Sequence, residues 1–125
     1  MKGKLMKLLA MGCLLTACAG TDTAKQAEYQ RIDAQKAKEM MQDSSVIVLD
    51  VRTQEEYAQG HIPNAELLPL DQIEKISEVA EKNETILVYC RSGNRSAQAA
   101  QYLIESGYEN VYDFGGILSW PYEIE

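Results

Sequence analysis

The sequence has 125 residues, of which 46% are hydrophobic and 25% are charged, with a formal net charge of −7. This length allows one folded domain with its own core and is too short for two. A nucleic-acid-binding protein needs a clustered basic face, so the acidic balance argues against a nucleic-acid partner.

The first 20 residues, "MKGKLMKLLAMGCLLTACAG", have the pattern of a secretory signal. Three early lysines precede an apolar run from Leu8 to Cys18 that ends among small residues. This run is too short for a membrane-spanning helix, which needs about 20 residues. Its end, Leu15-Thr16-Ala17-Cys18, resembles a bacterial lipobox, in which a peptidase cuts before the acylated cysteine.

Residues 1–17 are therefore predicted to be a lipoprotein signal peptide, cleaved before Cys18, which would carry the lipid. The alternatives are a plain cleavable signal and an amphipathic amino-terminal helix. The polar residues 18–27 would form a tether, and residues 28–125 the folded domain. This arrangement predicts an extracytoplasmic protein held by its lipid on a bacterial membrane, on the periplasmic side or at the cell surface.

Such processing would leave Cys90 as the one free thiol. Without a second thiol it cannot form an internal disulfide. One cysteine and one histidine, His61, do not supply four metal ligands. The sequence therefore predicts neither a metal site nor a cofactor.

From residue 29 onward, strand-like and helix-like segments alternate. A short strand candidate is followed by a helix that Asp33 can cap. A β-branched apolar run then predicts a strand covered on both faces, and Thr53 with Glu56 forms a capping-box pattern for a short helix ended by Gly60. The expected ranges are residues 29–32, 33–41, 46–51 and 53–60.

The second half of the chain continues this alternation. The clearest helix has an expected apolar side formed by Ala97, Ala100, Leu103 and Ile104. The expected ranges are an edge strand at 65–70, a weak helix at 71–80, a strand at 85–90, the clear helix at 94–107 and a last strand at 111–114, before Gly115-Gly116. Alternating strands and helices predict an α/β fold with a parallel sheet flanked by helices on both faces.

Cys90 ends the apolar strand "TILVYC" and is followed at once by Arg-Ser-Gly-Asn-Arg. In an open parallel sheet, ligands bind beyond the carboxyl ends of the strands. Backbone N–H groups of this loop and of the next helix can form a nest for negative charge, and Gly93 permits the turn. With Arg91 and Arg95, these groups favour the nucleophilic thiolate. The local pattern also allows a simply buried cysteine beside solvated arginines.

Three separated segments resemble the rhodanese family in their order and spacing. They are "VLDVRTQEEYAQGHIPNA" (48–65), "ILVYCRSGNRSAQAAQYLIESGYENV" (86–111) and "FGGILSW" (114–120), and with the first helix the resemblance covers about residues 28–125. It implies a five-stranded parallel sheet flanked by helices, in agreement with the pattern of elements. It also implies sulfur transfer, in which a cysteine takes sulfane sulfur from a small anionic donor such as thiosulfate. The resulting persulfide then passes its outer sulfur to cyanide or to a thiol acceptor.

By this resemblance, Cys90 is the nucleophile and persulfide carrier. The loop residues that would bind the substrate are Arg91, Ser92, Gly93, Asn94 and Arg95. They would supply backbone donors, while Arg91 and Arg95 would help to hold the anionic donor. Four residues separate Cys90 from Arg95, which is the spacing of relatives that handle sulfur. Relatives that handle phosphate or arsenate have one residue more.

Other residues of the resembling segments have supporting roles. Asp50 and Arg52 follow the neighbouring strand and are expected to brace the loop by ion pairing, with Glu56 as a candidate partner; a structural role is favoured over a catalytic one. For His61, in "GHIPNA", a packed turn position is favoured over a general base. Asn64 stands where the family usually has a glycine, and asparagine also tolerates a left-handed turn.

The sequence thus predicts a membrane-tethered sulfurtransferase. Two alternatives remain open: a rhodanese-like module that binds or senses sulfur species without turnover, and a relative that processes phosphate or arsenate. The activated thiol favours the enzyme over the binding module, and the length of the loop disfavours the phosphate reaction.

Overall fold

The computed structural model describes residues 28–125. The predicted signal peptide, the lipidation site at Cys18 and the tether lie outside the described residues. Within residues 28–125, no helix is long and apolar enough to cross a bilayer. In chain order the elements are β3 (Gln30–Arg31), α1 (Ala34–Met40), β4 (Ile47–Asp50), α2 (Gln54–Gln59), β5 (Glu66–Leu67), the 3₁₀ helix η3 (Leu70–Glu78), β6 (Thr85–Cys90), α3 (Asn94–Glu105), β7 (Asn110–Gly116) and the 3₁₀ helix η4 (Ile117–Ser119).

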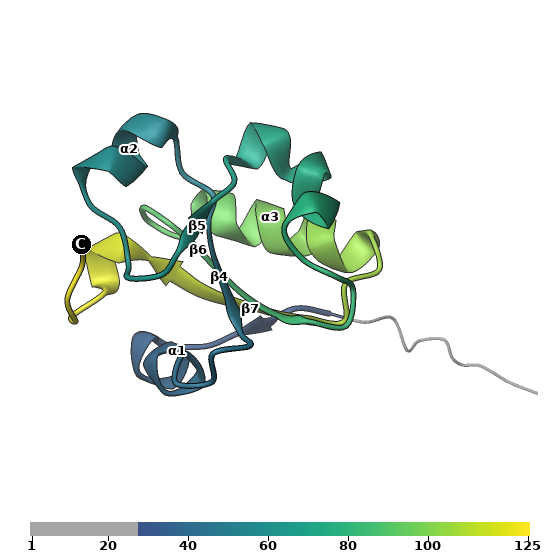
Figure 1. The fold of residues 1–125 in the computed structure, drawn as a ribbon, viewed down its shortest axis with the longest axis horizontal. Coiled ribbons are helices and arrows are strands. Elements are labelled where there is room, and N and C mark those ends of the chain that lie inside the picture. Colours follow the sequence, from purple (N-terminus) through teal and green to yellow (C-terminus); the bar gives the residue numbers. More distant parts are fainter. Residues whose placement is uncertain (1–27) are drawn as a thin grey trace, which may run out of the picture.

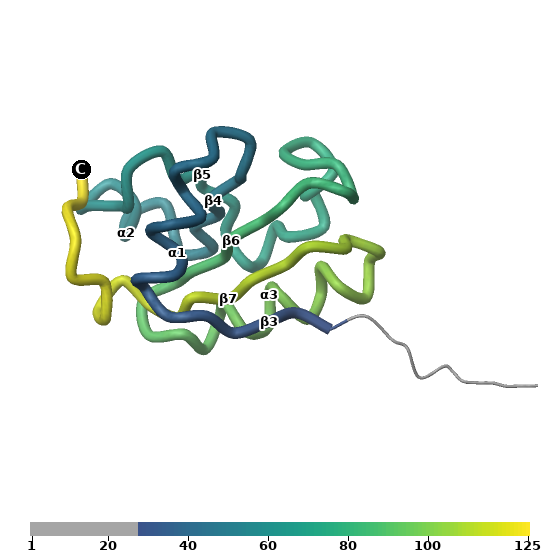
Figure 2. The backbone as a smooth tube through the Cα atoms, turned by 90° about the horizontal axis from the view of Figure 1, so that it is seen from below, coloured from purple at the N-terminus to yellow at the C-terminus, as the bar shows by residue number. Residues whose placement is uncertain are grey.

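The five strands form one parallel sheet in the order β3-β7-β6-β4-β5. Figure 2 shows the edge strand β3 running beside β7. The central strand β6 buries both of its faces: Ile86, Val88 and Cys90 face one core cluster, and Leu87 and Tyr89 face the other. A strand covered on both sides reads as a continuous apolar run, and the predicted parallel α/β sheet is confirmed.

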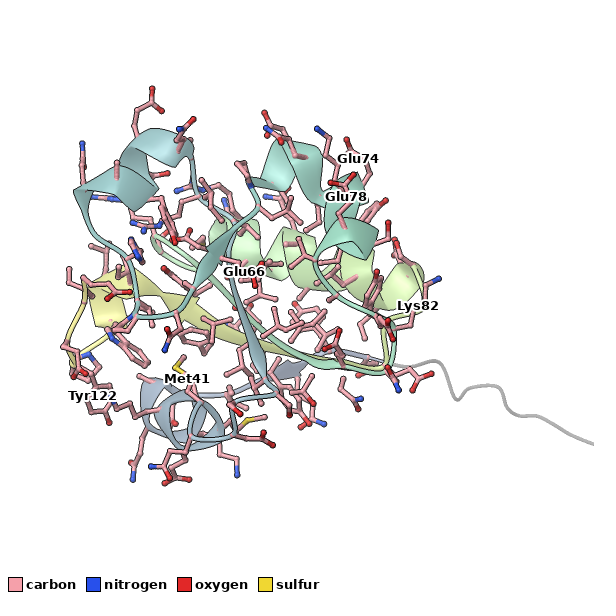
Figure 3. The ribbon with its side chains drawn as sticks, in the orientation of Figure 1. Met41, Glu66, Glu74, Glu78, Lys82 and Tyr122 are labelled. Carbon is pink, nitrogen blue, oxygen red and sulfur yellow. The ribbon has the colours of Figure 1, made fainter. Side chains whose placement is uncertain are left out.

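Helices cover both faces of the sheet. Helices α3 and η3 lie on one face and α1 on the other (Figure 1). The two layers meet the sheet through small and branched apolar side chains, which are Ala99, Ala100 and Leu103 of α3, Ile73 and Ile76 of η3, and Ala37 of α1. Glu74 and Glu78 lie on the outer side of η3, away from the sheet (Figure 3).

The predicted helix starts are confirmed by their caps. The Asp33 carboxylate accepts a hydrogen bond from the backbone N–H of Lys36 at 2.8 Å and begins α1. Thr53 and Glu56 form the complete capping box of α2. The weak helix expected at 71–80 is instead the 3₁₀ helix η3, which is interrupted by non-helical backbone at Gln72.

The predicted apolar side of α3 is partly wrong. Ser96 and Ala99 are fully buried together with the expected Ala100 and Leu103, whereas Ala97 and Ile104 are only partly buried. The helix is rotated in this way because the Ser96 hydroxyl bonds to the buried Asp113 carboxylate at 2.7 Å. The spacing of hydrophobic residues cannot predict the burial of a serine, because it counts only apolar side chains.

Strand β7 extends beyond its predicted end, through Gly115 and Gly116. Val88 pairs with Asp113, but Cys90 pairs with Gly116, so the register shifts and β7 carries a bulge. Gly115 takes a left-handed φ of +89° in this bulge. The bulge sets the glycines of β7 against the loop that follows Cys90.

Candidate functional site

Cys90 is the last residue of β6, with 1% of its surface exposed and its thiol free. The backbone N–H of Gly93 donates a hydrogen bond to its Sγ at 3.0 Å. Gly93 has a left-handed φ of +107° and precedes the first residue of α3. This conformation, which glycine adopts without strain, turns a loop amide toward the sulfur and stabilises negative charge there.

The loop packs closely on the backbone of β7. A β-carbon at Gly116 would overlap the carbonyl group of Arg91, so no other residue type fits this position. The same carbonyl accepts a hydrogen bond from the backbone N–H of Leu118 at 3.2 Å. The loop is therefore held from the side of β7 and η4 as well as by helix α3.

A buried polar network formed by Ser96 and Asp113 holds the Gly93 peptide in place. Ser96 Oγ lies 2.7 Å from Asp113 Oδ1, 3.1 Å from the Gly93 carbonyl oxygen and 3.3 Å from the Gly115 carbonyl oxygen. The Gly115 N–H also donates to Asp113 Oδ1, at 2.9 Å. Sequence reasoning missed both Ser96 and Asp113. The available signal was an aspartate inside the apolar strand "VYDF", directly before two glycines.

Asp50 and Arg52 form a buried two-pronged ion pair at the end of β4. Arg52 Nε donates to Asp50 Oδ1 at 3.0 Å, and Nη2 donates to Oδ2 at 2.7 Å. Arg52 Nη2 also donates to the Gly60 carbonyl oxygen at 2.8 Å, and the Tyr89 hydroxyl donates to Asp50 Oδ2 at 2.6 Å. Burial disfavours the charged guanidinium, but its hydrogen bonds with Asp50 prevail and raise the pKa of Arg52.

This pair corrects one expectation. Asp50 and Arg52 do form an ion pair, but Glu56 is not its third member. The pair instead fixes the turn at Gly60. The Arg52 side chain folds back on Asp50, two residues earlier, and also donates a hydrogen bond to the Gly60 carbonyl oxygen.

Glu56 pairs with Arg95, the last residue of the loop motif. Arg95 Nη1 and Nη2 donate to the two carboxylate oxygens of Glu56 at 2.7 and 3.0 Å. These bonds outweigh the effect of burial and, with the Thr53 backbone, lower the pKa of Glu56 to about 2. The pair joins the first turns of α2 and α3. Both Nη atoms of Arg95 thus face Glu56, and its contact with a donor anion stays a prediction.

Arg91 differs from the other two arginines at the site. Its residue is exposed, and it takes part in none of the ion pairs within residues 28–125. Its neighbours Ser92 and Asn94 are exposed as well. The loop residues predicted from the sequence therefore lie together next to Cys90. Among the arginines of the site, Arg91 is the one whose charge is available to a ligand.

His61 is a packed turn residue, as favoured from the sequence. Its Nδ1 lies 3.1 Å from the Tyr57 carbonyl oxygen, and its ring stacks on that of Tyr57 at 3.9 Å between centroids. Asn64 has the expected left-handed backbone, with φ +69°. In the part of the chain that the structure describes, no cluster of three or more histidine, cysteine, aspartate or glutamate side chains could hold a metal ion.

A five-stranded parallel sheet whose central strand ends in a thiol under a short, arginine-bearing loop defines a rhodanese-like domain. The family model described as "Rhodanese-like domain" matches residues 33–122, and the chain belongs to this family.

Among its relatives are proteins with sulfurtransferase names. The "Thiosulfate sulfurtransferase GlpE" of Coxiella burnetii is 37% identical over 93 residues, which cover 74% of this chain and 87% of that protein. A "Sulfurtransferase" of Allochromatium vinosum is 41% identical over 92 residues, covering 71% and 85%. The crystal structure of a rhodanese-like domain protein from Staphylococcus aureus is 38% identical, with a TM-score of 0.69 and coverage of 77% and 96%. These relatives support a sulfurtransferase.

Proposed function

We propose that the protein transfers sulfane sulfur from a small anionic donor such as thiosulfate to cyanide or a thiol acceptor, with Cys90 as the carrier. One observation carries this proposal: the Gly93 N–H is hydrogen bonded to the Sγ of a buried thiol at the end of the central strand. A donor of this kind, aimed at a sulfur atom, stabilises charge that would otherwise be costly in a buried position.

The reaction has two displacement steps. The Cys90 thiolate attacks the outer sulfur of thiosulfate, whose S–S bond breaks, and sulfite leaves with the electron pair. The outer sulfur of the Cys90 persulfide is then attacked by cyanide or by a thiolate, and the Cys90 thiolate is regenerated. No outside oxidant or reductant is needed. The loop from Arg91 to Arg95 would hold the negative charge of the outer sulfur through its backbone N–H groups.

The experiment compares the purified wild-type protein with Cys90→Ser in a thiosulfate-to-cyanide assay. We expect turnover by the wild type and none above the uncatalysed rate by the variant, because a serine hydroxyl cannot carry the sulfur. Intact-mass analysis after thiosulfate treatment should add one sulfur atom to the wild type only. Equal turnover by both proteins would refute the proposal. Binding of the donor without turnover would favour the sensing module, and hydrolysis of a chromogenic phosphoester would favour the phosphate reaction.

We also propose that the protein is anchored outside the cytoplasm by a lipid on Cys18, in support of which stands the lipobox-like sequence behind a basic start. Cys18→Ala should abolish labelling of the protein with a radioactive fatty acid and leave residues 1–17 attached, because the thiol is the proposed acylation site and the peptidase cuts before the acylated cysteine. Cys13→Ala is the matched control, since this cysteine would leave with the signal peptide. Fatty-acid labelling of the Cys18→Ala protein equal to that of the wild type would contradict lipidation at this position.

A further inference from the structure

A buried carboxylate on β7 has one oxygen atom without a partner. Asp113 is 1% exposed, and its Oδ2 has no hydrogen-bond partner among the residues that the structure describes. A buried polar atom in this state lowers the stability of the folded protein. Where a well-packed core contains such an exception, the residue often serves a functional site. The contacts of Asp113 therefore call for a reason other than stability.

The other oxygen of Asp113 joins two segments of the site. Its Oδ1 accepts hydrogen bonds from the Ser96 hydroxyl at 2.7 Å and from the Gly115 N–H at 2.9 Å. Ser96 has one hydroxyl hydrogen, and its Oγ lies within 3.3 Å of three oxygen atoms. The carboxylate is the nearest of the three and the charged one, so it takes this hydrogen. Asp113 thus ties the first turn of α3 to the bulge of β7.

The thiol lies on the same face of the sheet as this tie. Cys90 packs in one core cluster with α3, and Asp113 bonds to Ser96 of that helix. Gly93 comes directly before α3. Its N–H donates to Cys90 Sγ at 3.0 Å, and its carbonyl oxygen lies 3.1 Å from Ser96 Oγ. The direction of the Gly93 N–H therefore depends on where the first turn of α3 is held.

We propose that Ser96 and Asp113 are positioning residues for sulfur transfer. Asp113 holds Ser96, and Ser96 holds the first turn of α3, so that the Gly93 N–H stays aimed at the Cys90 sulfur. This inference rests on the sulfur-transfer function proposed above. Ser96 and Asp113 are 0% and 1% exposed, so neither is placed to touch a donor. A hydrogen-bond donor stabilises a negative sulfur best when its geometry is fixed before the charge develops.

The first measurement is the rate at which iodoacetamide alkylates Cys90 in the full chain, followed against pH by mass spectrometry of the Cys90 peptide. Ser96→Ala removes the hydroxyl and keeps the Asp113 charge, so the midpoint of the profile should move to higher pH by about half a unit. Asp113→Asn keeps an acceptor oxygen for Ser96 and removes a buried negative charge, so its midpoint should stay or move to lower pH. The other charged groups at this edge of the sheet are unchanged in both variants, and they are Asp50, Arg52, Glu56, Arg91 and Arg95.

The second measurement separates kcat from KM in the thiosulfate-to-cyanide assay. Ser96→Ala should lower kcat about tenfold and leave KM for thiosulfate within about twofold, because the lost contact orients the nucleophile and binds no donor. Asp113→Asn should keep kcat within about threefold of the wild type, since the acceptor remains. Ser106→Ala, at the other end of α3, is the matched control. Circular dichroism checks folding, and should Ser96→Ala not fold, Asp113→Ala removes the acceptor instead and should show the same loss of kcat.

The outcomes separate this inference from the function on which it rests. If the wild type turns over thiosulfate, but Ser96→Ala changes neither kcat nor the alkylation profile, the inference is overturned while sulfur transfer stands. A raised KM at unchanged kcat would place Ser96 in donor binding and would also overturn it, as would an Asp113→Asn midpoint as high as that of Ser96→Ala. If the wild type turns over no thiosulfate and Cys90 gains no sulfur, the sulfur-transfer function itself fails, and the role of Ser96 and Asp113 in it fails as well.

Discussion

Two arginine–carboxylate pairs stand at the same edge of the sheet, and they differ in burial. In the Arg52–Asp50 pair the side chains are 6% and 0% exposed, while in the Arg95–Glu56 pair they are 31% and 25% exposed. A buried ion that loses its partner keeps a large desolvation penalty, whereas water and salt screen a partly exposed pair. The first pair is therefore part of the folded core, and the second adjusts the position of the loop.

Their locations agree with this division. The Arg52–Asp50 pair ties the end of β4 to the Gly60 turn. Arg95 stands in the first turn of α3, where a cation opposes the helix dipole. Its placement there lowers the stability of the helix, and its pairing with Glu56 offsets that cost. The hydrogen bonds with Glu56 are the main cause of the raised pKa of Arg95.

Among the variants that test these two ion pairs, Asp50→Ala is expected to lower the free energy of unfolding the most. The variant leaves the buried Arg52 guanidinium without its carboxylate, so the free energy of unfolding should fall by about 3–5 kcal/mol. Urea denaturation followed by circular dichroism measures this change. Glu66→Ala, which removes an exposed carboxylate from the edge strand β5, is the control and should cost less than about 0.5 kcal/mol. A loss from Asp50→Ala as small as that of the control would show that the buried pair is dispensable.

An intermediate effect is expected from Tyr89→Phe. The Tyr89 hydroxyl donates to Asp50 and accepts the Ile62 N–H at 3.1 Å, so its removal leaves two buried polar groups short of a partner. Burial, together with the hydrogen bond to Asp50, raises the pKa of Tyr89, which keeps the hydroxyl protonated as a donor. The free energy of unfolding should fall by about 1–3 kcal/mol. Tyr102→Phe, on an exposed face of α3, should change it little, and equal losses in the two variants would argue against the network.

The smallest loss of unfolding free energy is expected from Glu56→Gln. It should be about 0.5–1 kcal/mol near neutral pH and should decrease with added salt, because the pair is partly exposed. The pKa of Glu56 is lowered from 4.5 to about 2 in the folded protein. Its stabilising contribution is thus fully present above about pH 4.5 and is lost as the pH falls through 2. The difference in unfolding free energy between wild type and variant should shrink over this range. Glu55→Gln is the matched control on the same helix, and a difference that persists at pH 2 would contradict the assignment.

Much of the fold could be predicted because its signals are local. The continuous apolar run of β6, the cap at Asp33 and the capping box at Thr53 each involve residues within a few positions of one another. The phase of α3 and the extension of β7 could not be predicted in this way. Both depend on Asp113, which bonds to Ser96 across 17 positions and shapes the bulge at Gly115.

The features of the site can likewise be separated into those that depend on neighbouring residues and those that depend on contacts between distant residues. The sequence by itself determined that Cys90 ends a buried strand and that a short loop with Gly93 and two arginines follows, because these are properties of consecutive residues. Only the tertiary structure decided which arginine stays unpaired. Arg95 finds its carboxylate 39 positions away, on α2, while Arg91 has no such partner among the described residues. Charge pairing depends on distance in space, and in a parallel sheet the strand ends that meet at one edge come from distant parts of the chain.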